Sequence, residues 1–348
     1  MMPSLPSPLD IKELTFNELK DHLVRASYPA FHAQQIFGWI YQKAAQDFDD
    51  MTGLPAKLRA QLKKDFSFSS AWLKEKKVSR DKTVKFLFKV GDDESVETVL
   101  IPSPKRGTLC VSTQVGCKFK CAFCASGLNG WSRDLSCAEI LDQVLFVKRA
   151  ASPARITHIV FMGIGEPFDN YDNVIKAIRR INAKEALGIA ARRITVSTCG
   201  LVPQIELFAR EPLQVELAVS LHAADDELRS KLMPVNRLYP LKELMACCRR
   251  YANETGRQVT FEYVLMKDIN TSLEHARRLA HLLQGFLSKV NLIVYNENVS
   301  LGFRSPSRAE VLAFKECLEQ QRIPSTIRTP RGSDIAAACG QLRFQAKS

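Results

Sequence analysis

Three cysteines lie within one stretch of eight residues and have the chemistry to bind metal. They are Cys117, Cys121 and Cys124, with the spacing C-x-x-x-C-x-x-C, and Phe123 directly precedes the third cysteine. Cysteine thiolates bind the irons of [4Fe–4S] clusters. Three thiolates would bind three of the four irons and leave the fourth iron open to a substrate. The spacing therefore predicts an iron–sulfur cluster with one open iron.

Two other uses of these cysteines compete with the cluster. Zinc sites usually have four ligands in two pairs, and no second Cys or His pair lies at zinc spacing in the chain. A disulfide framework fits poorly, because the chain has 348 residues and its first residues show no basic region followed by an apolar stretch. We therefore expect no signal peptide, a cytoplasmic location and reduced thiols, and zinc remains the alternative to the cluster.

Short polar residues and glycines stand where four predicted strands end. A glycine turn or a buried structural histidine would be the ordinary interpretation of any one of them. Four such ends in succession favour a cofactor-binding rim, because the carboxyl ends of parallel strands meet at one edge. The residues are Gly165, Glu166, Ser197, Ser220, Leu221, His222 and Asn296, after strands predicted over 156–162, 193–197, 215–220 and 290–295.

Two further cysteines have distinctive surroundings. Cys110 lies seven residues before Cys117, on the strand predicted to enter the cysteine loop. Cys339 follows three alanines and precedes Gly340, and such small residues predict a flexible, accessible loop. A single cysteine is more often a small buried residue. That is our interpretation of Cys137, Cys247, Cys248 and Cys317.

Strands and helices alternate after the cysteine loop, which predicts an α/β fold with a parallel sheet. Six β/α repeats suit an incomplete (β/α)6 barrel, and the strands predicted over 83–90 and 95–101 form a β extension before it. The other predicted strands are 109–115, 258–266 and 325–328, and the predicted helices are 136–150, 171–183, 240–253, 272–285 and 306–321.

The first part of the chain has a different pattern. Residues 10–75 carry apolar residues at helical spacing, notably over 16–24 and 30–44. We predict a small N-terminal helical accessory domain that binds RNA, residues 1–76, and a catalytic domain, residues 77–348. The net charge of +12 suits a polyanionic partner such as RNA, although charge alone supports this weakly. No apolar run approaches the length of a membrane span.

Taken together, these motifs resemble the radical S-adenosylmethionine (SAM) adenosine methyltransferases of the RlmN/Cfr family, and the RlmN branch most closely. The similarity runs over nearly the whole chain. The segments that carry it are Ala33-Gln34-Gln35-Ile36-Phe37-Gly38-Trp39-Ile40-Tyr41, Val96-Glu97-Thr98-Val99-Leu100-Ile101-Pro102, Leu109-Cys110-Val111-Ser112, the cysteine loop, Met162–Pro167, Ser220-Leu221-His222-Ala223 and Ala337-Ala338-Cys339-Gly340-Gln341-Leu342.

The resemblance implies a mechanism with two SAM molecules per turnover and a [4Fe–4S] cluster on Cys117, Cys121 and Cys124. One SAM methylates Cys339, and a radical generated from the second takes a hydrogen from that methyl group. The resulting carbon radical adds to the adenine, and Cys110 releases the product, which leaves a Cys110–Cys339 disulfide to be reduced. The resemblance further assigns a proton acceptor at Glu97 and SAM contacts at Gly165, Glu166, Ser197, Ser220, Leu221, His222 and Asn296.

The resemblance also implies substrates and partners. The expected product is C2-methyladenosine in 23S rRNA at the peptidyl-transferase centre, and in tRNA at the adenosine 3′ of the anticodon. We expect a flavodoxin or ferredoxin as electron donor, no membrane partner and a monomer. The alternatives are methylation at C8 of the adenine by a sister enzyme, and a non-catalytic, zinc-holding RNA-binding protein.

The chain departs from the family pattern at two places. Tyr295-Asn296-Glu297 stands where Trp-Asn-Pro is frequent, and the loop 298–303 that follows is atypical. Ser197-Thr198-Cys199-Gly200 stands where Ser-Thr-Ser-Gly is familiar, so the chain has an additional thiol near the predicted site. Every cysteine that the family chemistry requires is present, and we therefore expect an active enzyme.

Overall fold

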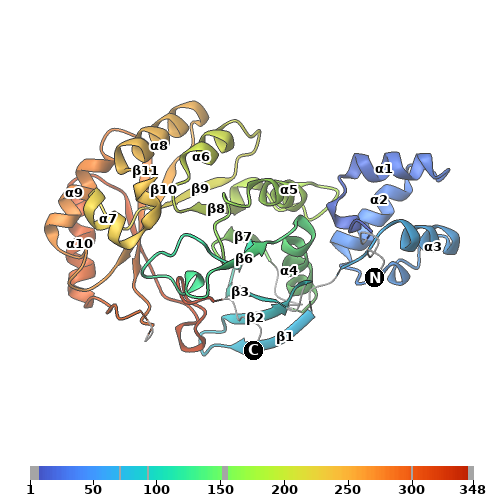
Figure 1. Cartoon of the computed structure of the whole chain (residues 1–348), viewed down its shortest axis with the longest axis horizontal. Helices are drawn as coiled ribbons and strands as arrows, with labels where there is room; N and C mark the ends of the chain where they lie inside the picture. Colours follow the sequence, from blue (N-terminus) through green and yellow to red (C-terminus); the bar gives the residue numbers. More distant parts are fainter. Residues whose placement is uncertain (1–7, 70–71, 92–93, 151–155, 299–300, 344–348) are drawn as a thin grey trace, which may run out of the picture.

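A ten-stranded mixed sheet is the centre of the computed structural model, which describes residues 8–69, 72–91, 94–150, 156–298 and 301–343 (Figure 1). The first residues of the chain, whose pattern argued against a signal peptide, and residues 299–300 of the atypical loop lie outside the described residues. The strand order is β1-β2-β3-β4-β7-β8-β9-β10-β11-β12. A separate two-stranded sheet pairs β5 (Gln114–Gly116) with β6 (Trp131–Asp134) beside the cysteine loop.

Seven neighbouring strands of the large sheet are parallel, and helices connect them. The strands are β4 (Arg106–Cys110), β7 (His158–Phe161), β8 (Ile194–Thr198), β9 (Glu216–Ser220), β10 (Val259–Leu265), β11 (Ser288–Val294) and β12 (Ser325–Arg328). The helices are α4 (Cys137–Ala150), α5 (Tyr171–Asn182), α6 (Val202–Ala209), α7 (Asp226–Leu232), α8 (Leu241–Thr255), α9 (Leu273–Leu283) and α10 (Arg308–Gln320). The predicted series of six β/α units is confirmed.

The central strands are apolar because both of their faces are covered. All seven residues of β10 are buried, as expected for a strand that has helices on one side and the interior of the sheet on the other. The helices lie along the outside of the curved sheet (Figure 1). This arrangement brings the carboxyl ends of β4 and β7–β12 to one edge, where the motifs of the sequence lie.

Three antiparallel strands extend the sheet at its β4 edge. They are β1 (Trp72–Val78), β2 (Val84–Lys89) and β3 (Ser95–Ser103), and β3 pairs with β4. The prediction of a helical region through residue 75 was wrong at its end, because residues from Trp72 onward pair with β2. All of β1 is exposed, so it lacks the apolar alternation that reveals a strand from sequence alone.

The single strand predicted over 109–115 is also corrected, because the chain leaves the ladder after Cys110. Gln143 of α4 causes the break. Its side-chain Oε1 accepts a hydrogen bond from the Ser112 backbone N (2.9 Å), and its Nε2 donates to the Ser112 carbonyl (2.9 Å). A side chain thus replaces the strand partner at Ser112, and the chain turns toward β5.

The N-terminal segment is helical, with α1 (Phe16–Arg25), α2 (His32–Phe37) continued by a π-helical turn (Gly38–Gln42), and α3 (Ala56–Asp65). A capping box starts α1, because Thr15 and Glu18 each accept a hydrogen bond from the backbone N of the other. This segment packs beside α4 and α5 (Figure 1). The division of the chain at residue 76 stays a prediction, and β1 crosses that point.

Polar contacts attach the N-terminal segment to α4. Lys12 is fully buried, and its ammonium lies 3.3 Å from Asp142 of α4. Lys148 and Arg149, at the end of α4, donate to the carbonyls of Tyr41 (2.6 Å) and Ala44 (3.0 Å). No helix in the described residues is long and apolar enough to cross a membrane.

Candidate active site

The loop that carries the three cysteines is closed by backbone hydrogen bonds. Cys117 N donates to the carbonyl of Gly130 (2.8 Å) across the β5–β6 pair, and Ala122 N donates to Leu232 at the end of α7 (2.9 Å). Gly116 adopts a φ of +81°, and a Cβ there would collide with the carbonyl of Gly130. These contacts tie the loop to the residue before β6 and to the end of α7.

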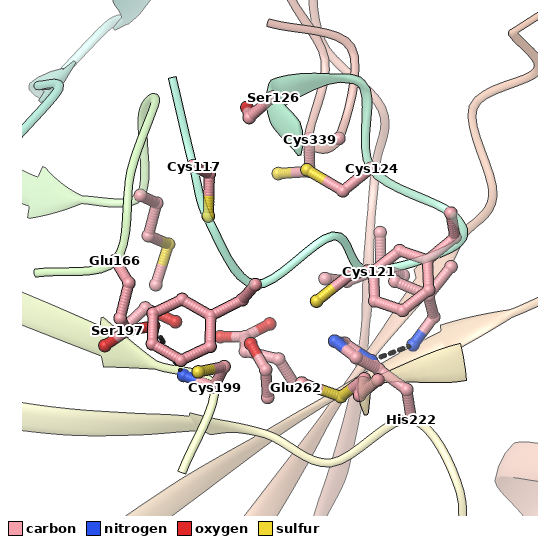
Figure 2. Close-up of a pocket in the computed structure, with 18 of the residues that line it drawn as sticks. Cys117, Cys121, Cys124, Ser126, Glu166, Ser197, Cys199, His222, Glu262 and Cys339 are labelled. Atoms are coloured by element: carbon pink, nitrogen blue, oxygen red, sulfur yellow. Dashed lines mark hydrogen bonds between the residues drawn. The ribbon is translucent and has the colours of Figure 1, made fainter. Parts of the chain in front are cut away.

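The three cysteines line one pocket together with residues from the ends of β7, β8 and β9. Figure 2 shows their side chains on the same loop, on the opposite side of the pocket from Glu262. Burial raises the pKa of Cys117 to about 12 and raises those of Cys121 and Cys124. A bound cation is therefore needed to hold these groups as thiolates.

The arrangement of the cysteines fits a cluster better than one ion. Within the part of the chain that the structure describes, no group of three His, Cys, Asp or Glu side chains is placed to bind a single metal ion. In a [4Fe–4S] cube each cysteine binds a different iron, so the sulfurs need not converge on one point. Three thiols on one loop are therefore a donor set that suits the cluster.

The end of β7 contributes Gly165 and Glu166, which both line the pocket. Gly165 has a φ of +102°, and a Cβ there would lie 2.6 Å from the Cβ of Gln114, so this turn requires glycine. Glu166 is buried, and its carboxylate accepts hydrogen bonds from the backbone N of Cys199 (2.7 Å) and of Phe168 (3.1 Å). Glu166 therefore ties the end of β7 to the end of β8.

His222 follows β9 with a positive φ of +58°. Its Nδ1 accepts a hydrogen bond from Val264 N (3.0 Å), so the neutral ring carries its proton on Nε2. Burial, with a smaller effect of Arg229, lowers the pKa of His222 to about 3, and the ring is therefore neutral at physiological pH. The ring also packs edge-on against Phe123, directly before Cys124 (4.6 Å between centroids). His222 thus supports the cysteine loop from β9.

The remaining predicted contacts divide into two groups. Ser197, Ser220 and Asn296 line the pocket with His222. The Leu221 side chain is fully buried, and this residue is not part of the pocket lining. The backbone of Leu221 is engaged instead, because its N donates to the carbonyl of Glu262 (3.0 Å).

Arg229 was not predicted from the sequence, and it joins the ends of β8 and β9 by hydrogen bonds. Its guanidinium is completely buried and donates to the carbonyls of Leu221 (3.2 Å), Cys199 (2.8 Å) and Ser220 (3.2 Å). On α7 it stands among ordinary charged residues, so the sequence carries no signal that this one points inward.

Cys339 and Cys110 meet at a second pocket that adjoins the first. Cys339 is exposed, lies on the segment after β12 and lines both pockets, whereas Cys110 is buried at the end of β4 and lines the second. Both are free thiols. Burial and the nearby Cys339 raise the pKa of Cys110 to about 12, and Arg328 opposes this rise.

Glu97, like Leu221, is a predicted residue that lies outside the lining of both pockets. It is buried on β3, and its carboxylate lies 2.8 Å from the Lys85 ammonium. It also accepts a hydrogen bond from the backbone N of Arg343 (3.0 Å). In this structure Glu97 therefore holds the segment that carries Cys339.

Three further residues of the site were missed. Met162, Glu262 and Arg328 all line the first pocket, and Met162 and Arg328 line the second as well. Signals existed for two of them. Glu262 is the single acid in the apolar strand β10, and Arg328 is a polar residue at a strand end.

Two parts of the chain match families of known proteins. Residues 111–280 match the Radical SAM superfamily, and residues 9–67 match the ribosomal RNA large subunit methyltransferase N-terminal domain. The chain is 46% identical over 335 residues to a probable dual-specificity RNA methyltransferase RlmN of Thermoanaerobacter sp. (strain X514), with 96% of this chain and 97% of the relative covered.

A second relative and a solved structure are also similar to the chain over nearly its whole length. A probable dual-specificity RNA methyltransferase RlmN of Geobacillus kaustophilus is 48% identical over 343 residues, which cover 98% of this chain and 93% of the relative. A crystal structure of a radical SAM methyltransferase from Sphaerobacter thermophilus superposes with a TM-score of 0.93 at 46% identity, and covers 96% of this chain and 99% of that one.

Proposed function

This chain belongs to the RlmN family of radical-SAM RNA methyltransferases, and we propose that it methylates C2 of an adenosine in 23S rRNA at the peptidyl-transferase centre. We extend the proposal to the adenosine 3′ of the anticodon in tRNA, and to a cytoplasmic location. The observation that carries the proposal is the meeting of Cys339 with Cys110 at a pocket that adjoins the three-cysteine loop.

The residues present fit the family's cofactors, a [4Fe–4S] cluster and SAM. Cys117, Cys121 and Cys124 would hold the cluster, and the rim formed by Gly165, Glu166, Ser197, Ser220, His222 and Asn296 would hold SAM. Leu221 is proposed as a SAM contact on the strength of the family resemblance alone. When bound, these groups supply the methyl group and the radical that activate an adenine carbon without nucleophilic character. We propose that each turnover uses two SAM molecules.

Cys339 and Cys110 would each form a covalent bond at a different step of the reaction. Cys339 is exposed and would carry the methyl group whose carbon becomes bonded to the adenine. Cys110 is fixed on β4 and would form a bond with the Cys339 sulfur as the bond from that sulfur to the carbon breaks. The resulting disulfide has to be reduced by two electrons before the next turnover, and the proposed electron donor of the enzyme is a flavodoxin or ferredoxin. Glu97 is the proposed acceptor of the C2 proton, on the strength of the family resemblance.

The target adenine has to leave its base stack to reach this site. The site lies in pockets at the strand ends, where a paired base cannot enter. Unpaired loop nucleotides cost the least to turn outward. We therefore propose that the targets lie in RNA loops. The match to the N-terminal domain of large-subunit rRNA methyltransferases favours C2 over C8 as the methylated position.

Mass spectrometry of RNA nucleosides tests this function. The gene is expressed in a bacterial strain that lacks its own C2-methyladenosine enzyme, and 23S rRNA and tRNA are digested separately. We expect C2-methyladenosine in both fractions, and none with Cys121→Ala. C8-methyladenosine would instead support the sister activity, and the absence of either product would contradict the proposal.

An iron assay tests the cluster itself. Protein purified without oxygen should contain iron and sulfide and absorb visible light, and Cys121→Ala should lose both elements. Cys317→Ala, a change of a half-buried cysteine on α10, is the matched control and should retain them. A colourless wild-type protein loaded with zinc would refute the cluster.

A further inference from the structure

Glu262 is a buried carboxylate that faces the first pocket with one oxygen unpartnered. It is 4% exposed, and its Oε1 accepts a hydrogen bond from the Asn291 side-chain amide (2.9 Å). Its Oε2 accepts no hydrogen bond from the described residues. A buried acceptor without a donor costs free energy, so a ligand that donates a hydrogen bond at this point would gain affinity.

Arg328 lies beside that oxygen, and the partners of its Nη1 are Glu262 and the Met162 sulfur, both at long distance. Its Nη1 is 3.7 Å from Glu262 Oε2 and 3.7 Å from the Met162 sulfur. The distance to Glu262 is too long for a hydrogen bond. The pocket therefore presents an acceptor and a donor side by side, and each is able to bind a different atom of one ligand.

The position of Arg328 points to the target base as that ligand. Arg328 lines both pockets, and Cys339 and Cys110 line the second pocket with it. On the proposed function, on which this inference rests, the adenine bonds to the carbon carried by Cys339 and is released by Cys110. The base must therefore lie against the surface that Arg328 contributes.

We infer that Glu262 and Arg328 recognise the Watson–Crick edge of the target adenine. The Glu262 carboxylate accepts a hydrogen bond from the N6 amino group, and the Arg328 guanidinium donates one to N1. Adenine presents this donor and acceptor on neighbouring atoms, and flipped bases are recognised along this edge. Because C2 is bonded to N1, a hydrogen bond at N1 also fixes the position of C2.

The same pair would reject guanine. Guanine carries the O6 acceptor where adenine carries its amino group, and that oxygen would face the Glu262 carboxylate without a proton between them. It also carries a proton on N1, which would face the Arg328 donors. SAM contains an adenine with the same edge, so the affinity for SAM has to be measured beside the base preference.

Base analogues test the inference one atom at a time. Three hairpin RNAs differ only at the target, which is adenosine, purine riboside without the amino group, or 1-deazaadenosine without N1. The measurement is kcat/KM for methylation at C2. Wild-type enzyme should prefer adenosine over each analogue by about 10- to 100-fold, the range for a hydrogen bond to a charged group.

Glu262→Met and Arg328→Met should each lose the preference for adenosine over one of the two analogues only. Glu262→Met should use adenosine and purine riboside equally, yet still discriminate against 1-deazaadenosine. Arg328→Met should show the reverse. Dividing each substrate preference of a variant by the same preference of the wild-type enzyme cancels differences in the intrinsic reactivity of the analogues. Glu274→Gln, an exposed acid on α9, is the control and should retain both preferences.

Further readouts keep the inference falsifiable. If Glu262→Met does not fold, Glu262→Gln retains a neutral acceptor and should weaken the preference for the amino group without abolishing it. An unchanged preference in both Glu262 variants overturns the inference, and so does a SAM affinity lowered about tenfold with base preference intact. A wild-type enzyme that methylates no adenosine RNA overturns the proposed function as well, so the two failures are distinguishable.

Discussion

Cys110 and Cys339 lie in two regions that hold a thiol in opposite ways. Cys110 ends β4, where its neighbours in the ladder are Val99 of β3 and Val160 of β7, and it is buried. Cys339 is exposed on an irregular segment in which Gly332, Ala336 and Gly340 have positive φ. One thiol is thus part of a paired strand, whereas the other is exposed on a segment outside the sheet.

The segment of the exposed thiol is nevertheless held in place, mostly by the antiparallel extension. Lys85 Nζ donates to the Ala336 carbonyl (3.0 Å), and Glu97 accepts from the backbone N of Arg343. The turn between β1 and β2 binds the same segment, because Asp81 accepts from Gly332 N (3.1 Å). We therefore interpret β1–β3 as the part of the fold that positions the Cys339 segment.

The largest expected effect separates the two thiols by role. Cys339→Ala should abolish RNA methylation and leave no RNA covalently attached, because no thiol then carries the carbon. Cys110→Ala should form the protein–RNA bond and fail to release it, since a thiol needed only for release cannot prevent addition. Gel mobility before and after ribonuclease digestion measures the attached RNA.

Cys248→Ala is the control for this pair, because Cys248 is a buried cysteine of α8 outside both pockets. It should turn over normally. If Cys110→Ala purifies free of RNA and still turns over, Cys110 is a core residue and the contrast between the buried and the exposed thiol has no catalytic meaning.

The next largest effect is on stability and concerns Arg229, which lies at the ends of β8 and β9. Arg229→Met should lower the free energy of unfolding by about 3 kcal/mol or more, because the Cys199 carbonyl and Asn236 Oδ1 lose their donor and the carbonyls of Leu221 and Ser220 lose one donor each. Chemical denaturation measures this. Arg277→Met, at an exposed position of α9, should change stability by less than about 0.5 kcal/mol. Equal stabilities of the two variants would contradict the bracing role of Arg229.

A smaller effect is expected where the antiparallel extension holds the Cys339 segment. Lys85→Met removes the donor to Ala336 and leaves Glu97 without its cation, which should cost about 2 kcal/mol and speed amide hydrogen exchange across 332–343. SAM cleavage without RNA should persist, because the cysteine loop and the rim are intact. The double variant Lys85→Met/Glu97→Gln should recover part of the stability, and no recovery would show that the ion pair is not the source of the loss.

The smallest effect is a pH dependence of the same segment. Burial would raise the pKa of Asp81, but hydrogen bonds from Thr83, Ser79 and Gly332 outweigh it and lower the pKa to about 2, from an ordinary value of 3.8. The stability that Asp81 provides is thus complete above about pH 4 and is lost as the pH falls toward 2. Amide exchange of 332–343 should accelerate over this range, and Asp81→Asn should remove that acceleration. An unchanged profile in Asp81→Asn would show that another group controls the segment.

The sequence by itself determined the features that depend on local spacing. The alternation of strands and helices predicted the β/α units, and the structure confirms them. Cys117, Cys121 and Cys124 belong to one short loop, so their spacing was enough to place them together. Residues at the carboxyl ends of successive parallel strands share one edge in any such fold, which is why Glu166, His222 and others were predicted as one rim.

Only the tertiary structure decided which side chains line the pocket and which form hydrogen bonds that hold the backbone in place. Arg229 turns inward to carbonyls of two strand ends, and Gln143 of α4 ends the ladder at Ser112. Glu97 binds the backbone of Arg343, which is 246 positions away along the chain. Such contacts join residues that are remote in sequence, and their hydrogen bonds form only once packing has excluded water. No periodicity or spacing in a single sequence predicts such contacts. Glu262 and Arg328 are also remote in sequence, so only the tertiary structure shows that they lie side by side.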